Sequence, residues 1–147
     1  MAAQDFFALQ DALGADVIDY GEVGRHLLTR IVRRVAGMPA AQAALGCVRA
    51  GRYDRVLTDG EHIGIPLALL LSLRRRAPRH VTIGHLLTTP TKRAVFGLLR
   101  PQRRLDAVIV HAETQRQEAS DRLGIAANRL ALLPYQVDTD SWSPRAA

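Results

Sequence analysis

Short apolar runs alternate along this chain with longer segments in which apolar residues recur every three or four positions. Five runs have the length and composition of β-strands, at residues 16–20, 55–58, 80–84, 107–110 and 130–133. The longer segments have helical periodicity. They are residues 3–13, 27–35, 39–50 and 65–73, a basic segment ending near residue 100, and residues 112–123. Strands separated by helices predict an α/β fold with a Rossmann-like, doubly wound parallel sheet of about five strands.

Length and composition indicate one globular domain over residues 1–147. The single cysteine, Cys47, excludes an internal disulfide or a cysteine-based zinc cluster and fits a reducing compartment. The N-terminus carries Asp5 and no basic lead, so it does not read as a signal peptide. The longest apolar run, residues 63–73, is too short to span a membrane. We therefore expect a cytoplasmic protein, with peripheral attachment to the inner face of the membrane as a further option.

The positive charge is concentrated in the middle of the chain. Residues 62–105 contain no acid but carry nine basic residues, namely Arg74, Arg75, Arg76, Arg79, Lys92, Arg93, Arg100, Arg103 and Arg104. One interpretation is that they are solvated residues at helix C-termini, where the helix dipole stabilises positive charge. The other is that they form a patch that binds anionic lipid head groups or an acidic acceptor. The segment is poor in aromatic residues, so base stacking and a nucleic-acid partner are not expected.

Polar residues directly follow four of the predicted strands, at residues 59–62, 84–89, 111–114 and 134–136. Ligands of open α/β sheets bind beyond the carboxyl ends of the strands, and helix N-termini there offer N–H groups to anions. We predict the candidate site at this edge. Its catalytic candidate is His85, and its substrate-binding candidates are Asp59, Glu61, His62, Thr88, Lys92 and Gln136.

Several of these residues keep a second interpretation. His85 can be a structural strand-end histidine, and Glu61 and His62 can orient an acceptor hydroxyl or cap the following helix. A convergence of Asp59, Glu61, His62 and His85 on a metal lacks dedicated spacing such as H-E-x-x-H, so we expect no metal. No G-x-G-x-x-G motif is present, and no dinucleotide or other cofactor is expected.

The last third of the chain carries a family resemblance. A strand ending at His111 leads to a polar helix, Gly124, a second strand, and the residues Pro134-Tyr135-Gln136-Val137-Asp138 followed by Trp142. This order resembles the segment that closes the N-terminal domain of family 4 retaining glycosyltransferases of the GT-B fold. Their hinge reads P-N-G-V-D-x-x-x-F, so the Asn-Gly pair is replaced here.

Three further places in the chain bear on the resemblance. The run from Val81 to His85 is similar to the family's (V/I)-x-T-x-H, whose histidine lies near the reacting sugar. The family's His-x-His pair is replaced by Leu57 and Asp59. His111 stands where the family has a small serine-type residue, and we expect it to be structural.

The resemblance, over residues 3–142, implies the acceptor-binding half of a hexosyltransferase-type enzyme. Its partners would be a nucleotide-sugar donor, held by a C-terminal domain with an E-x7-E motif, and a sugar, lipid or small-molecule acceptor. Neither that domain nor the family's first strand is found in these residues, so we expect no transfer by this chain alone and an open sheet edge. One alternative is a non-catalytic basic α/β module that docks on an anionic membrane surface or a partner protein. Another is a nucleotide-binding Rossmann-like domain of unrelated function.

Overall fold

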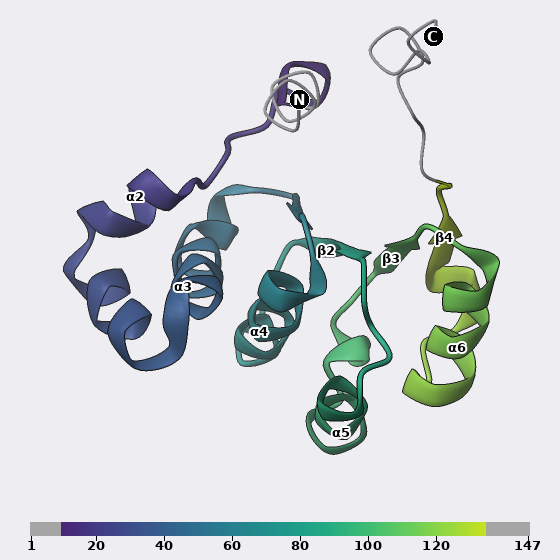
Figure 1. Ribbon diagram of the computed structural model, residues 1–147. Helices are drawn as coiled ribbons and strands as arrows, with labels where there is room; N and C mark the ends of the chain where they lie inside the picture. Colours follow the sequence, from purple (N-terminus) through teal and green to yellow (C-terminus); the bar gives the residue numbers. More distant parts are fainter. Residues whose placement is uncertain (1–9, 135–147) are drawn as a thin grey trace, which may run out of the picture.

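A computed structural model describes residues 10–134, which form a parallel β-sheet and a layer of helices (Figure 1). The strands are β1 (Arg55–Thr58), β2 (Arg79–Gly84), β3 (Ala107–Val110) and β4 (Leu130–Leu132), hydrogen-bonded in the order β1-β2-β3-β4. The helices are α2 (Tyr20–Arg25), α3 (Leu27–Arg49), α4 (Glu61–Ser72), α5 (Pro90–Leu99) and α6 (Glu113–Leu123). Short 3₁₀ turns are η1 (Ala50–Arg52), η2 (Pro101–Arg103) and η3 (Ala127–Arg129). The α/β class is confirmed.

Four of the five predicted strands are confirmed, and every strand pair in the described sheet is parallel. One row of the register runs across all four strands through Thr58, Thr82, Val108 and Leu130. Parallel pairing brings the carboxyl ends of the strands to one edge of the sheet, which we call the C-edge. The polar segments that follow the strands start from this edge.

The predicted strand at residues 16–20 is wrong. Residues 15–19 belong to no strand, and α2 begins at Tyr20. The carboxylate of Asp19 accepts a hydrogen bond from the backbone N–H of Glu22 at 2.8 Å and caps this helix, a preferred role for aspartate. A side-chain contact, and not strand pairing, connects this segment to the rest of the domain, because the hydroxyl of Tyr53 donates to Asp16 Oδ2 at 2.5 Å. The described sheet therefore has four strands, and a fifth is not seen.

The two helices predicted at residues 27–35 and 39–50 form one element, α3, which is kinked at Gly37. Gly37 has φ 85° and ψ 174°, a conformation in the region that favours glycine. Pro39 follows at the start of the second arm, where its missing N–H costs little. Residues 3–9 of the first predicted helix, and all residues after 134, lie outside the described part.

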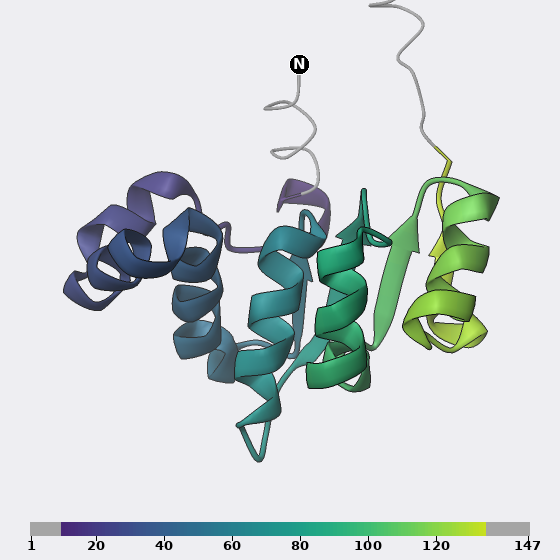
Figure 2. The same ribbon diagram turned by 60° about the horizontal axis from the view of Figure 1, so that its bottom comes forward.

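The three crossover helices α4, α5 and α6 lie on one face of the sheet, and α3, which precedes β1, lies on the same side (Figures 1 and 2). This follows from the strand order, because successive right-handed crossovers that advance in one direction place their helices on the same side. A doubly wound sheet requires a reversal of strand order, and the described strands contain none. The predicted doubly wound arrangement is therefore not seen in residues 10–134.

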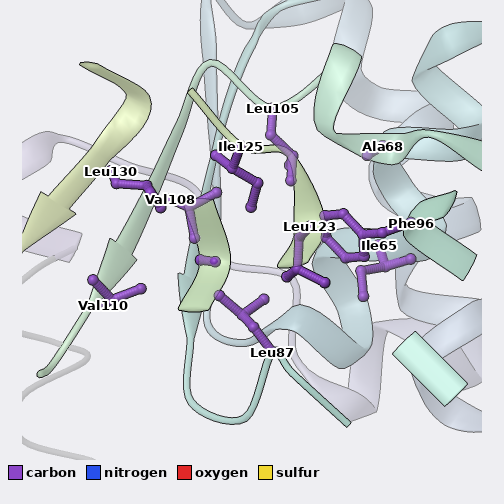
Figure 3. Packing of buried hydrophobic residues seen from close by; sticks show 11 residues of the cluster. Ile65, Ala68, Leu87, Phe96, Leu105, Val108, Val110, Leu123, Ile125 and Leu130 are labelled. Atoms are coloured by element: carbon purple, nitrogen blue, oxygen red, sulfur yellow. The ribbon is translucent and has the colours of Figure 1, made fainter. Parts of the chain in front are cut away.

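The main core fills the space between this helical layer and the sheet (Figure 3). Its centre contains Phe96 of α5, Leu123 of α6 and Val108 of β3, which are at most 3% exposed. A second cluster between α3 and α4 contains Ala43, Ala50, Leu67 and Leu71. These contacts fix the positions at which α4, α5 and α6 start, next to the C-edge.

The opposite face of the sheet is apolar. Its residues alternate with the buried ones and include Leu57, Val81, Ile83 and Ile109, each partly or substantially exposed. Parallel sheets are ordinarily covered on both faces, because each strand carries apolar side chains in both directions. We call these four side chains the open sheet face.

We expect the isolated chain to self-associate through the open sheet face and through the edge of β1, which has no partner strand within residues 10–134, since both favour intermolecular contact. Replacing Val81 and Ile83 together with threonine should shift the mass measured by light scattering towards the monomer with little change in the melting temperature. Threonine keeps the strand propensity and removes apolar surface.

Val108→Thr is the control, because Val108 is fully buried on the helix-covered face and its replacement should lower the melting temperature. A wild-type chain that is a compact monomer with a sharp, reversible melt would contradict the prediction.

Candidate functional site

The loops at the C-edge bring His85 and the turn at residues 59–62 together, as the sequence predicts. His85 follows β2 and Asp59 follows β1, and His85 Nε2 lies 3.8 Å from Asp59 Oδ1. Both side chains are nearly half exposed, at 43% and 48%. The imidazole and the carboxylate therefore both reach the surface at the C-edge.

Gly60 sets the shape of the turn that leads from β1 directly into α4. Its φ of 129° and ψ of 149° form a conformation that other residues rarely adopt. A Cβ atom at Gly60 would lie 2.6 Å from Cε1 of His62 and 3.7 Å from Cδ2 of His85. Both imidazoles are therefore packed around this glycine, so Asp59, His62 and His85 lie in one small area.

His85 is also connected to the loop after β3. The imidazole rings of His85 and His111 stack with centroids 5.3 Å apart and planes inclined by 25°. The side-chain amide of Gln115 donates to the carbonyl of His85 at 2.9 Å, and its oxygen accepts from the N–H of His111 at 3.0 Å. His111 Nδ1 lies 2.8 Å from the carbonyl oxygen of Leu133. These contacts are consistent with the structural role expected for His111.

Glu61 organises the loop that carries His85. Glu61 is only 5% exposed, and its carboxylate accepts hydrogen bonds from the backbone N–H groups of His85 at 2.9 Å and Leu86 at 3.3 Å. The ammonium of Lys92 donates to the same carboxylate at 2.6 Å and to the carbonyl of Leu86 at 2.5 Å. The Glu61–Lys92 pair therefore joins the start of α4 to the start of α5 across the His85 loop.

The ionised state of Glu61 is favoured despite its burial. Burial alone would raise the pKa of the carboxyl, but the hydrogen bond from Lys92 and those from backbone N–H groups together lower the pKa below its ordinary value. The carboxylate is occupied by these contacts. Glu61 and Lys92, predicted as substrate-binding residues, are thus placed to position His85.

Thr88 contacts α6 and not the His85–Asp59 pair. Its hydroxyl donates to Glu118 Oε2 at 2.7 Å, and the two residues line a hollow of about 120 Å³ with Gly84, Leu86, Leu87 and Gln115. Gln136, the remaining predicted substrate-binding residue, lies outside the described residues.

Gln115 and Glu118 were not singled out in the sequence. The available signal was their position in the first turns of a helix that follows a strand. That signal does not say which loop they contact.

The chemistry open to this site is proton exchange and hydrogen bonding. A half-exposed imidazole can donate to or accept from a substrate hydroxyl, and Asp59 can orient the ring. Within residues 10–134, no group of three or more His, Cys, Asp or Glu side chains is arranged to hold a metal ion. Comparison of the chain with protein-family models, curated proteins and solved structures found no match.

Proposed function

We propose that this chain is the acceptor-binding half of a retaining glycosyltransferase with GT-B architecture, its sheet forming part of a Rossmann-like domain. The observation that carries the proposal is the half-exposed His85–Asp59 pair at the C-edge of a parallel sheet, with 3.8 Å between Nε2 and Oδ1. The family resemblance at Val81 to His85 puts a histidine at the reacting sugar. A C-edge is also where ligands of open α/β sheets bind.

Each residue has a definite part in the proposal. His85 hydrogen-bonds a hydroxyl of the reacting sugar, and Asp59 holds the imidazole in orientation. His62, next to this pair, contacts the acceptor. Glu61 and Lys92 are positioning residues because they fix the loop that carries His85. Thr88 and Gln136 remain predicted substrate contacts.

The donor in this proposal is a nucleotide-activated sugar bound by a second domain that faces the C-edge. Stabilising the charge of the transition state requires preorganised groups on both walls of such a cleft. Residues 1–147 contain no E-x7-E motif of the donor-binding type, so we expect transfer only from the full-length gene product. A reading frame that continues past Ala147 into a domain with this motif would support the proposal.

In the full-length protein, His85→Ala should lower kcat by about 100-fold while the melting temperature stays within a few degrees. The reason is that the side chain is 43% exposed and contributes little packing. Turnover and thermal melts, measured on the same preparations, check the result.

His26→Ala is the matched control, since His26 is an exposed histidine at the start of α3, in a part of the chain that does not contribute to the C-edge. It should change neither quantity. If His85→Ala instead lowers the melting temperature and turnover per folded molecule survives, His85 is structural and the proposed site is wrong.

A second candidate function is a non-catalytic basic module that docks on an anionic membrane surface. The observation that favours it is a cluster of arginines at the other edge of the sheet, away from His85. A reading frame that stops at Ala147 would favour this candidate over the transferase.

A further inference from the structure

Five arginines surround a hollow of about 470 Å³ at the end of the helical layer opposite the C-edge. We call this the arginine pocket; it is lined by Leu69, Ser72, Arg74, Arg75, Leu98, Leu99, Arg100, Pro101, Arg103 and Arg104. The residues come from the C-terminal ends of α4 and α5 and from η2. In Figure 2 these helix ends lie at the bottom of the layer, while the strands point upward.

Within residues 10–134, none of the five arginines forms an ion pair with a carboxylate. Arg74 donates to the carbonyl of Cys47. Nε of Arg104 is buried and has no hydrogen-bond partner within residues 10–134. Cations held close together without counter-charges attract an anion.

Large apolar side chains are exposed beside the arginines. Leu73 is 83% exposed, Leu98 is 82% exposed and Leu99 is 52% exposed. Leu98 and Leu99 line the pocket, and Leu73 precedes Arg74. Arginines that surround exposed leucines match the two layers of a bilayer surface, in which phosphates lie at the head groups and acyl chains lie below them.

The backbone at Arg100 adds a local observation. Arg100 ends α5 with φ 52° and ψ 48°, in the left-handed region where glycine is usual. It is the only described residue other than glycine with a positive φ. The side chain of Arg100 therefore lines the pocket from a backbone conformation that is strained for arginine and would be unstrained for glycine.

We infer that the arginine pocket and its leucines dock this chain on a bilayer that contains anionic phospholipids, with head-group phosphates in the pocket. The inference does not depend on sugar transfer, so its failure would leave the His85 experiment intact. The docking surface contains only some of the nine basic residues expected from the sequence to form a patch. Lys92 is bound to Glu61 at the C-edge, whereas Arg100, Arg103 and Arg104 join Arg74 and Arg75. No helix of the described residues is long and apolar enough to cross a membrane, so the contact is peripheral.

The test is co-sedimentation with phosphatidylcholine vesicles with and without phosphatidylserine, at low and high salt. The wild-type chain should bind only the phosphatidylserine vesicles and should be released at high salt. Each arginine near the surface contributes about fivefold to the affinity, so replacing Arg100, Arg103 and Arg104 together with glutamine should weaken binding about a hundredfold.

The matched control replaces Arg93, Arg116 and Arg122 with glutamine. It removes the same number of charges outside the pocket and should leave binding within a few-fold of wild type. Leu98→Ser tests insertion. Because Leu98 is 82% exposed, the variant should keep the wild-type melt and lose about tenfold in vesicle affinity.

Three outcomes would overturn the inference. One is equal sedimentation with neutral and anionic vesicles, and another is an equal loss of binding in both triple variants. The third is tight binding of pyrophosphate or of single-stranded RNA together with no binding of phosphatidylserine vesicles. That result would identify the pocket as a site for a soluble polyanion.

Discussion

Gly64→Ala is expected to lower the free energy of unfolding by about 2–3 kcal/mol or to prevent folding altogether. A Cβ atom at this position would lie 2.2 Å from Oγ1 of Thr82 and 2.8 Å from Oγ1 of Thr58. Both threonines are buried in the sheet beneath α4, and the hydroxyl of Thr58 donates to that of Thr82 at 2.9 Å. Because Thr82 is 0% exposed, it has no space to move into. The helix would have to rise from the sheet, and its contacts with both core clusters would loosen.

The matched control for Gly64→Ala is Gly97→Ala. Gly97 is also inside a helix, α5, but a Cβ atom there would meet nothing within 4 Å. Its replacement should stabilise the chain by roughly 0.5–1 kcal/mol, the ordinary gain of alanine over glycine in a helix. Denaturant unfolding of the two variants checks the prediction. Equal effects of the two substitutions would contradict the close packing of α4 on Thr58 and Thr82.

Acidification is expected to destabilise the fold between pH 6.5 and about 4 through His80. His80 is 0% exposed, and its Nε2 lies 3.2 Å from Oγ1 of Thr58. Burial lowers the pKa of His80 from 6.5 to about 4, and the nearby Asp106 opposes this change only in part. The unfolded chain therefore binds a proton in this range that the folded chain does not, and stability falls as the pH falls.

The size of this effect follows from the difference between the two pKa values. At about 1.4 kcal/mol for each unit, the loss below pH 4 approaches about 3 kcal/mol. Glu61 contributes in the same direction, because its pKa is lowered in the folded state and its stabilisation is lost as the pH falls through that pKa. Urea midpoints measured from pH 7 to pH 4 test the prediction.

The control for the pH effect is His80→Gln, which retains an amide able to bond Thr58 and does not titrate. The urea midpoint of this variant should vary less with pH than that of the wild type, and the residual slope should reflect Glu61 and other carboxylates. If wild type and variant lose stability equally on acidification, His80 is not the group responsible.

Local sequence was enough to place most of the elements. Residues 55–58 and 107–110 are strands as predicted, because a parallel strand with helices on one side still reads as a short apolar run bounded by polar turns. Gly124 ends α6 in the left-handed conformation that the sequence signalled. Residues 16–20 alternate between apolar and polar residues as a strand does, but a strand forms only if a neighbouring strand pairs with it. Asp19 instead caps a helix, which the alternation could not show.

The sequence by itself also determined where a site would lie, because the carboxyl ends of parallel strands meet at one edge whatever the details of packing. The tertiary structure decided which residues meet there. Glu61 and Lys92 are 31 positions apart in the chain and form a pair only because α4 and α5 start side by side at this edge. Gln115 reaches the carbonyl of His85 across 30 positions for the same kind of reason.

For the basic residues too, the sequence determined one part and the tertiary structure the other. Composition alone predicted a basic excess in residues 62–105, but not which of its members share a surface. Helix length decided this, because each helix runs from the C-edge to the opposite end of the sheet. Lys92, in the first turn of α5, stays beside Glu61, while Arg100, just past its last turn, joins Arg74 and Arg75 about 12 Å away along the helix axis.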